Sequence, residues 1–307
     1  MNPLYILIIL LTLFCSTPGG AATGLHNPDE TITGILAMDP VQVLDLFENG
    51  TFPDINASTL MEHQDLLYRK LALGLANRGD YERAESVLLS IPPVVRGYDS
   101  TLLLAFLYTR MQNPAAAMEH IVSLQVQYPD DLKLDNARAY LLCMAGSPAQ
   151  ARRIMEPVII EVPLYGPFLD TWGTILAAEG RYADAEMACR KAHALMPDDA
   201  EVLAHLGMIL HKSGRTADAQ DVYQRSVRID PAFGEGQKGY ARVLMDLKRY
   251  AEAGKAIRAA LLVMPGDSDL ISWEQEIDGI LLNWHIRQEQ EANRPLLIKR
   301  VVPESRS

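Results

Sequence analysis

Apart from Cys15 near the N-terminus, the side chains that could do chemistry in this sequence are two cysteines, Cys143 and Cys189, and a few scattered histidines. Nucleophilic catalysis by Cys143 would need a histidine partner, and the sequence nominates none. His205 and His211 are six residues apart, which on one helix points them in different directions, so they do not chelate a metal. There is no glycine-rich phosphate loop, no His-Glu-x-x-His, no Cys-x-x-Cys and no Gly-x-Ser-x-Gly. We therefore expect a protein that is not an enzyme and that has neither a metal site nor a cofactor.

The charge of the chain narrows the class of its partner. The 307 residues include 39 Asp and Glu against 28 Lys and Arg, a net charge of −11 at pH 7. A surface of this sign repels the phosphates of nucleic acids. It also disfavours electrostatic docking on anionic lipids. We therefore expect no nucleic-acid partner, and no membrane contact except through the N-terminal segment.

The elements that must position any site are organised by an internal repeat. Residues 166–267 form three consecutive blocks of 34 residues that align without a gap, and each block closes near a proline. A fixed period of this length is typical of a stacked array. The register extends backwards through three more blocks, the first of which needs a one-residue deletion. The six repeats are residues 65–97, 98–131, 132–165, 166–199, 200–233 and 234–267.

Two positions of the repeat carry a small residue in every copy. We expect each repeat to form two antiparallel helices, A and B, that cross closely there, because a larger side chain would hold the helices apart. Gly180 and Gly214 allow the tight turn between A and B. Cys143 and Cys189 fall in different repeats, so we expect two free thiols. The small residues are Ala72, Ala105, Ala139, Gly173, Gly207 and Ala241 at position 8, and Ala84, Ala117, Ala151, Ala185, Ala219 and Ala253 at position 20.

These residues resemble the tetratricopeptide repeat (TPR) consensus over residues 65–267. Leu169 stands in the place of the first consensus aromatic. Pro114 and Pro148 stand where the consensus has a later aromatic residue. Proline at that position can serve as the first residue of helix B. The resemblance implies an all-α fold, a right-handed α-solenoid of about six helix pairs with a C-terminal capping helix. The best-matching repeat carries Trp172, Gly173, Gly180, Tyr182, Ala185, Ala192 and Pro197 at consensus positions.

The same resemblance implies that helices A line a concave face, into which positions 2, 5, 9, 12 and 13 of each repeat point. A groove of mixed aromatic, polar and basic residues suits an extended peptide or a helix of a partner protein. The alternative is that these residues only solvate an unused face. The candidate partner-binding residues are Arg69, Phe106, Arg110, Lys133, Asn136, Tyr140, Asp170, Thr174, Met208, His211, Lys212, Lys238 and Arg242, with Glu201 and Asp246 at equivalent positions.

One specialised TPR site does not fit. TPR domains that bind chaperones clamp a terminal carboxylate with Lys and Asn at set positions of three successive repeats, as the resemblance implies. Lys238 at position 5 is followed by Arg242 rather than Asn at position 9, and no full repeat comes after it. We therefore exclude a cytosolic chaperone cofactor.

The N-terminal segment, residues 1–22, has the features of a secretory signal. Leu4–Cys15 is a nearly unbroken apolar run of 12 residues, too short for a bilayer core, which takes about 20. Small residues follow it and favour cleavage after Ala22. There is no Lys or Arg before Arg69, which departs from the usual signal. We expect export to the periplasm or another extracytoplasmic space; an uncleaved anchor and lipidation at Cys15 are the alternatives.

The segment before the repeats, residues 23–64, has seven acidic residues and no Lys or Arg. We expect two short helices in it, over residues 28–37 and 40–48. Its acidic side chains are expected to form a solvated face rather than a cation site. Asn49 and Asn56 both fit the glycosylation acceptor pattern, which is short and matches often by chance.

The segment after the repeats has two parts. Residues 268–292 are apolar at helical spacing with a polar opposite face, as a capping helix requires. Residues 293–307 form an apolar, basic tail. The tail either folds back on the acidic body of the chain or serves as a strand or docking segment for a partner.

Together these features predict a non-catalytic scaffold or adaptor that binds partner proteins or peptides on its concave face. By family-level analogy alone, it would act in cell-envelope assembly, such as pilus, secretion or exopolysaccharide machinery. Two alternatives stay open. The chain could be a regulatory or targeting subunit of an envelope enzyme complex, or a self-associating structural protein whose acidic N-terminus meets its basic tail.

Overall fold

The computed structural model describes residues 28–53, 55 and 57–292, and every regular element in these residues is an α-helix. The expected all-α fold is confirmed. The expected signal over residues 1–22 and the basic tail over residues 293–307 lie outside the described residues. None of the described helices combines the length and the apolar character needed to cross a membrane.

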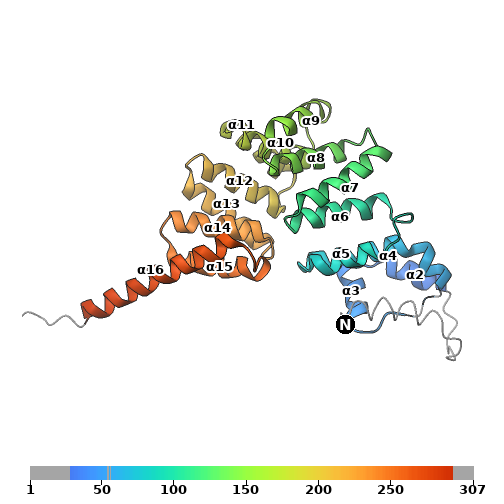
Figure 1. Ribbon diagram of the computed structural model, residues 1–307, viewed down its shortest axis with the longest axis horizontal. Helices are drawn as coiled ribbons and strands as arrows, with labels where there is room; N and C mark the ends of the chain where they lie inside the picture. Colours follow the sequence, from blue (N-terminus) through green and yellow to red (C-terminus); the bar gives the residue numbers. More distant parts are fainter. Residues whose placement is uncertain (1–27, 54, 56, 293–307) are drawn as a thin grey trace, which may run out of the picture. The chain divides into compact units, whose positions relative to one another are not determined.

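The chain divides into two compact parts, the N-terminal part up to Leu195 and the C-terminal part from Met196, and Figure 1 shows the helices of both. The helices of the N-terminal part are α2 (Pro28–Ala37), α3 (Pro40–Glu48), α4 (Ala57–Asn77), α5 (Tyr81–Leu89), α6 (Tyr98–Arg110), α7 (Pro114–Gln127), α8 (Leu132–Met144), α9 (Pro148–Glu161), α10 (Gly166–Ala178) and α11 (Tyr182–Leu195). Those of the C-terminal part are α12 (Ala200–Lys212), α13 (Thr216–Ile229), α14 (Gly234–Asp246), α15 (Tyr250–Val263) and α16 (Ser268–Ala292).

The helices keep the period of the sequence. From α6 to α15, each helix A has 13 residues and each helix B has 14. Each of these helices A packs most extensively against the helix B that follows it. Within each part the fold is therefore a succession of helix pairs, which the 34-residue spacing positions one after another.

The second residue after helix A has a left-handed backbone in every repeat. Gln112, with φ +57°, and Lys248, with φ +60°, hold this conformation although they carry side chains. Glycine adopts it without the clash that a β-carbon brings. The remaining four repeats have glycine there, at Gly79, Gly146, Gly180 and Gly214.

Helices A and B cross as closely as the small residues predict. The six alanines of position 20 are all 0% exposed. A β-carbon on Gly173 would lie 2.4 Å from Cys189 Sγ, and one on Gly207 would lie 2.9 Å from the ring of Tyr223. The glycines therefore make room for larger side chains of the partner helix.

The acidic N-terminal segment contributes to the core of the N-terminal part. Both expected short helices are present, as α2 and α3, and Asp39 caps α3 by accepting hydrogen bonds from the Val41 and Gln42 backbones. Val43 on α3 is 0% exposed. A β-carbon on Gly74 would lie 2.4 Å from the carbonyl oxygen of Pro40, so α3 crosses α4 in close contact.

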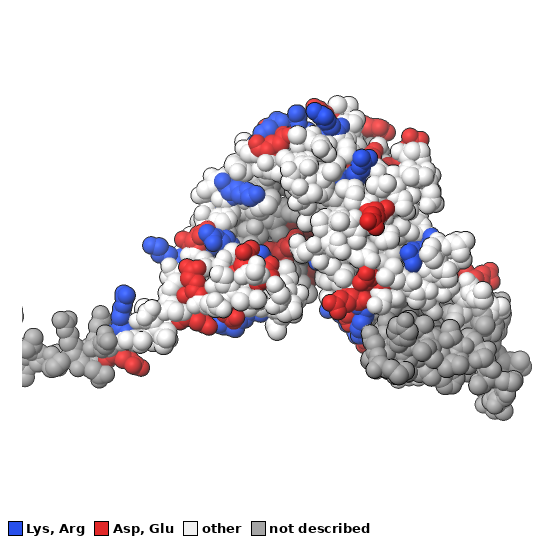
Figure 2. All heavy atoms as spheres, viewed as in Figure 1, with Lys and Arg blue, Asp and Glu red and all other residues white. Residues whose placement is uncertain are grey.

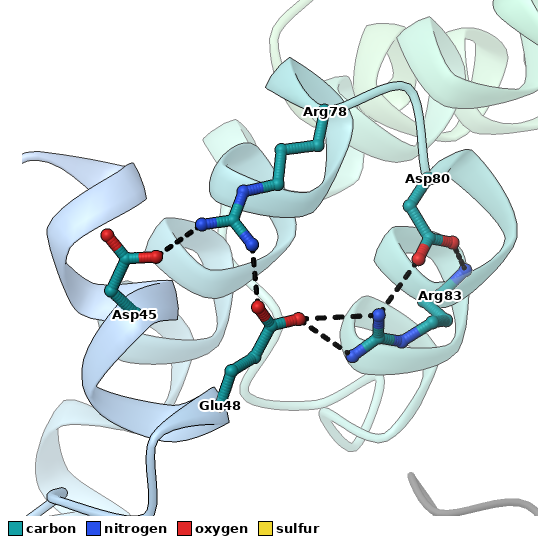
Figure 3. Close-up of polar contacts among 5 residues, drawn as sticks. All are labelled: Asp45, Glu48, Arg78, Asp80 and Arg83. Carbon is teal, nitrogen blue, oxygen red and sulfur yellow. Dashed lines mark hydrogen bonds and ion pairs between the residues drawn. The ribbon is translucent and has the colours of Figure 1, made fainter.

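Two acidic side chains of α3 are exposed, as expected, and also form ion pairs with arginines (Figure 3). Glu48 lies 2.6 Å from an Arg78 nitrogen and 3.4 Å from an Arg83 nitrogen, and Asp45 pairs with Arg78. Arg83 also bonds Asp80, the residue that caps α5. The arginines come from the end of α4 and the start of α5, which the crossing of α3 over α4 brings within reach of α3. This network fixes α3 on the first helix pair.

Candidate functional site

The candidate site is the set of side chains at positions 2, 5, 9, 12 and 13 of helices A, called here the A-helix face. It lies on α4, α6, α8 and α10 in the N-terminal part, and on α12 and α14 in the C-terminal part. In both parts, side chains of the face make contacts between one helix A and the next.

In the C-terminal part, several basic side chains of the face meet carboxylates of the chain itself. Lys238 Nζ lies 2.8 Å from Asp267 Oδ2 and 2.8 Å from Asp269 Oδ2, so α14 is bound to the start of α16. His211 Nε2 lies 2.7 Å from Asp246 Oδ2, which joins α12 to α14. On the face drawn in Figure 2, acidic and basic side chains lie next to each other over this part.

The same relation recurs in the N-terminal part. Arg69 at position 5 of one repeat pairs with Asp99 at position 2 of the next. Lys238 and Asp269 stand in the same two positions of later repeats. These aspartates were not among the predicted site residues, although the period of the sequence places an acid opposite each cation. Position 5 cations therefore hold successive helices A together.

An aromatic ring completes the C-terminal face. Lys238 Nζ lies 5.8 Å and Arg242 Cζ 5.6 Å from the centre of the Trp273 ring on α16. Arg242 also pairs with Asp246 at 3.3 Å along α14. Trp273 lies in the expected capping helix over residues 268–292, and the two cations at its ring show that it also borders the candidate site. Met208 and Lys212 lie on α12 of the same part.

Burial and charge act in opposite directions on the pKa of Lys238 and Asp267. Burial disfavours the charged form of each group, but the hydrogen bonds and charges they share outweigh it. The pKa of Lys238 is therefore raised and that of Asp267 lowered. Asp267 also accepts hydrogen bonds from the backbones of Asp269 and Leu270, as an N-cap of α16 does.

Lys238→Met is expected to lower the free energy of unfolding by about 1 kcal/mol at pH 7, because the pair is partly exposed. Since the pKa of Asp267 is lowered in the folded state, its contribution is present above its unfolded pKa of about 3.9 and is lost as the pH falls through the folded value. Without Lys238 the folded pKa of Asp267 moves back toward the unfolded value, so this loss should be smaller and the stabilities of the two proteins should converge as the pH falls. Thermal melts between pH 3 and 7 measure it.

Arg249→Met is the control for Lys238→Met, because it removes an exposed pair with Glu252 inside one helix turn. Such pairs contribute only about 0.3–0.5 kcal/mol. Equal effects of the two substitutions across the pH range would contradict the assignment of Lys238 as the link to α16.

In the N-terminal part, the face presents an exposed aromatic ring. Phe106 is 42% exposed, although its chain neighbours Ala105 and Leu107 are buried. The guanidinium carbon of Arg110 lies 5.2 Å from the centre of the ring. Tyr140 holds the position of Phe106 in the next repeat, on α8. The predicted residues Lys133 and Asn136 lie on the first two turns of α8.

Asp170 does not project from the face as expected. Its side chain is buried, at 8% exposed, and Cys189 Sγ lies 3.9 Å from its Oδ1. Its backbone carbonyl accepts a hydrogen bond from Thr174 Oγ1 at 3.1 Å. Because position 24 holds a small cysteine here, the carboxyl group fits between α10 and α11. Sequence position alone did not reveal this space.

The buried thiol of Cys189 is not set up as a nucleophile. Burial raises its pKa well above the ordinary value, and the charge and hydrogen bond of Asp170 raise it further. Cys143 and Cys189 are both buried free thiols. Among the described residues, no three His, Cys, Asp or Glu side chains are grouped in a way that could hold a metal ion.

Comparisons with known proteins agree with this geometry. The family model described as tetratricopeptide repeat matches residues 176–233 and 210–272. A TPR repeat-containing protein of Pseudomonas aeruginosa is 33% identical over 106 residues, which are 34% of this chain and 18% of the relative. The match therefore spans less than a fifth of that relative.

Two solved structures share the fold. A thermophilic TPR protein of Thermus thermophilus has a TM-score of 0.52 at 16% identity, over 59% of this chain and 98% of that one. A tetratricopeptide repeat protein of Parabacteroides merdae has a TM-score of 0.55 at 11% identity, over 81% of this chain and 99% of that one. Residues 176–272 therefore resemble the tetratricopeptide repeat family in sequence, and the 34-residue helix pairs share the fold of these TPR proteins.

Proposed function

We propose that the protein is a non-catalytic interaction scaffold, and that the A-helix face of its N-terminal part binds an extended peptide or a helix of a partner protein. The observation that carries this proposal is the exposed Phe106 ring with Arg110 beside it. Aromatic and arginine side chains are the residue types that most often anchor protein interfaces.

The contrast between the two parts of the chain supports this choice. In the C-terminal part, Lys238, His211 and Arg242 are already bonded to carboxylates, and a partner would have to break those pairs. Around Phe106, binding would instead cover apolar ring surface that is in contact with water. Covering such surface is favourable by about 25 cal/mol per Å². The N-terminal part is therefore the stronger candidate.

Phe106→Ala and Arg110→Ala are each expected to weaken peptide binding about tenfold, the size of a moderate interface anchor. The purified chain would be used to select peptides from a displayed random library, and the selected peptides titrated against each variant. Val126→Ala is the control, since Val126 is 80% exposed on helix B of the same repeat. Equal affinities for all three variants would remove this face as the site.

We further propose that the scaffold works outside the cytoplasm, in assembly at the cell envelope. The apolar run Leu4–Cys15 with small residues behind it supports export. Mass spectrometry of the N-terminus of the protein from its own cells tests this, and a mature chain starting at Thr23 is the expected result. A retained Met1 would contradict cleavage.

A further inference from the structure

Helix α16 carries an apolar stripe that continues past the body it packs on. Leu270 and Ile277 are 0% exposed, and Leu281 is partly buried in the same cluster. Trp284, one helical step further along the stripe, is 55% exposed. Figure 1 shows α16 running beyond the end of α15. The last part of the stripe therefore has no covering element among the described residues.

A groove lies where the stripe leaves the body. Its volume is about 380 Å³, within the range of sites that hold small groups of apolar atoms. Tyr250 at the start of α15 and Ile280, Leu281 and Trp284 on α16 supply its apolar lining. Its charged lining is the Arg249–Glu252 pair, which is internally neutralised, and Lys248. The apolar part of the lining suits apolar side chains.

We infer that the C-terminal tail of the same chain, residues 293–307, folds back along α16 and places its apolar residues in this groove. The tail follows α16 directly and contains the run Leu296–Val302, in which only Lys299 and Arg300 are polar. An occupant tethered this close has an effective concentration in the millimolar range. The tail therefore occupies the groove more readily than a second copy of the chain or a free peptide would.

The length of the tail fits the distance it must cover. Trp284 lies about 14 Å before residue 293 along a helix that rises 1.5 Å per residue. An extended chain covers about 3.3 Å per residue, so about five tail residues return to this level. Leu297 and Ile298 then lie beside Trp284.

The charges of the two segments are complementary. Between Ser268 and Glu289, α16 carries five acidic residues and one basic residue. Residues 293–307 carry four basic residues and one acidic residue. An antiparallel return sets the basic tail along the acidic helix, and the attraction weakens with salt. Apolar contact holds the tail in the groove, and charge sets its direction along α16.

The test places a photoreactive benzoylphenylalanine at position 297 of the full chain, followed by irradiation and peptide mapping. The expected result is a crosslink inside one molecule to peptides containing residues 248–252 or 280–284. Trp284→Asp is expected to abolish this crosslink, because it puts a charge in the groove. Leu262→Asp, at a residue 86% exposed outside the groove lining, should leave it unchanged.

Three outcomes overturn the inference. Crosslinks spread over unrelated peptides mean that the tail has no defined binding position on the rest of the chain. A crosslink to the groove that is found only in dimers and disappears when the protein is diluted assigns the groove to a second copy of the chain. A crosslink that survives Trp284→Asp in a chain with an unchanged circular dichroism spectrum places the tail elsewhere. Protection of Trp284 from acrylamide quenching, lost on deleting residues 293–307, supports the inference without a crosslinker.

Discussion

Phe233→Ala is expected to lower the free energy of unfolding by about 3–5 kcal/mol, the largest effect of any substitution considered for this protein. Phe233 precedes α14 and is only 2% exposed. A β-carbon on Gly236 would lie 2.9 Å from Phe233 Cδ1, so the backbone of α14 is packed directly against the ring. The substitution leaves a cavity that rigid helix backbones cannot close.

Tyr165→Ala is the matched control for Phe233→Ala. Tyr165 holds the equivalent repeat position before α10, but it is 39% exposed and contacts Phe168 edge to face at 4.6 Å. Its removal should cost about 1 kcal/mol, mostly the aromatic contact. Urea unfolding followed by far-UV circular dichroism measures both. Similar small losses for the two variants would show that Phe233 is not the core residue its burial indicates.

Ala219→Leu is expected to cost about 3 kcal/mol, the upper end for overpacking. Ala219 on α13 is 0% exposed at the crossing with α12, where Gly207 already leaves no room beside Tyr223. Three further carbon atoms must push the two helices apart. Ala217→Leu, exposed on the same helix, should change stability by less than about 0.5 kcal/mol. A melting temperature unchanged by Ala219→Leu would contradict the repeat register itself.

The period of the sequence was sufficient to predict where the helices lie. Ala185 and Ala219 are buried at the crossings because backbone approach depends on side-chain size, which the residue type states directly. The period also locates Gln112 and Lys248 at the left-handed turn that glycine occupies elsewhere. Neither residue type would indicate that conformation without the repeat.

The candidate site was less predictable than the fold. Residue position placed Lys238 on the A-helix face but did not show that Asp267 and Asp269 already bind it. Asp170 was predicted to face a partner and instead lies against Cys189. Both outcomes depend on which side chains come within about 3–4 Å of each other, and that distance is set by the packing of neighbouring helices.

By itself, the sequence determined the helix pairs, their spacing and the small residues at their crossings, because these depend on local backbone preference and side-chain volume. Only the tertiary structure decided which charged residues are already paired, which carboxyl group is buried, and where apolar surface such as Phe106 and Trp284 stays uncovered. Those properties arise from contacts between residues of different helices, and residue type does not specify such contacts.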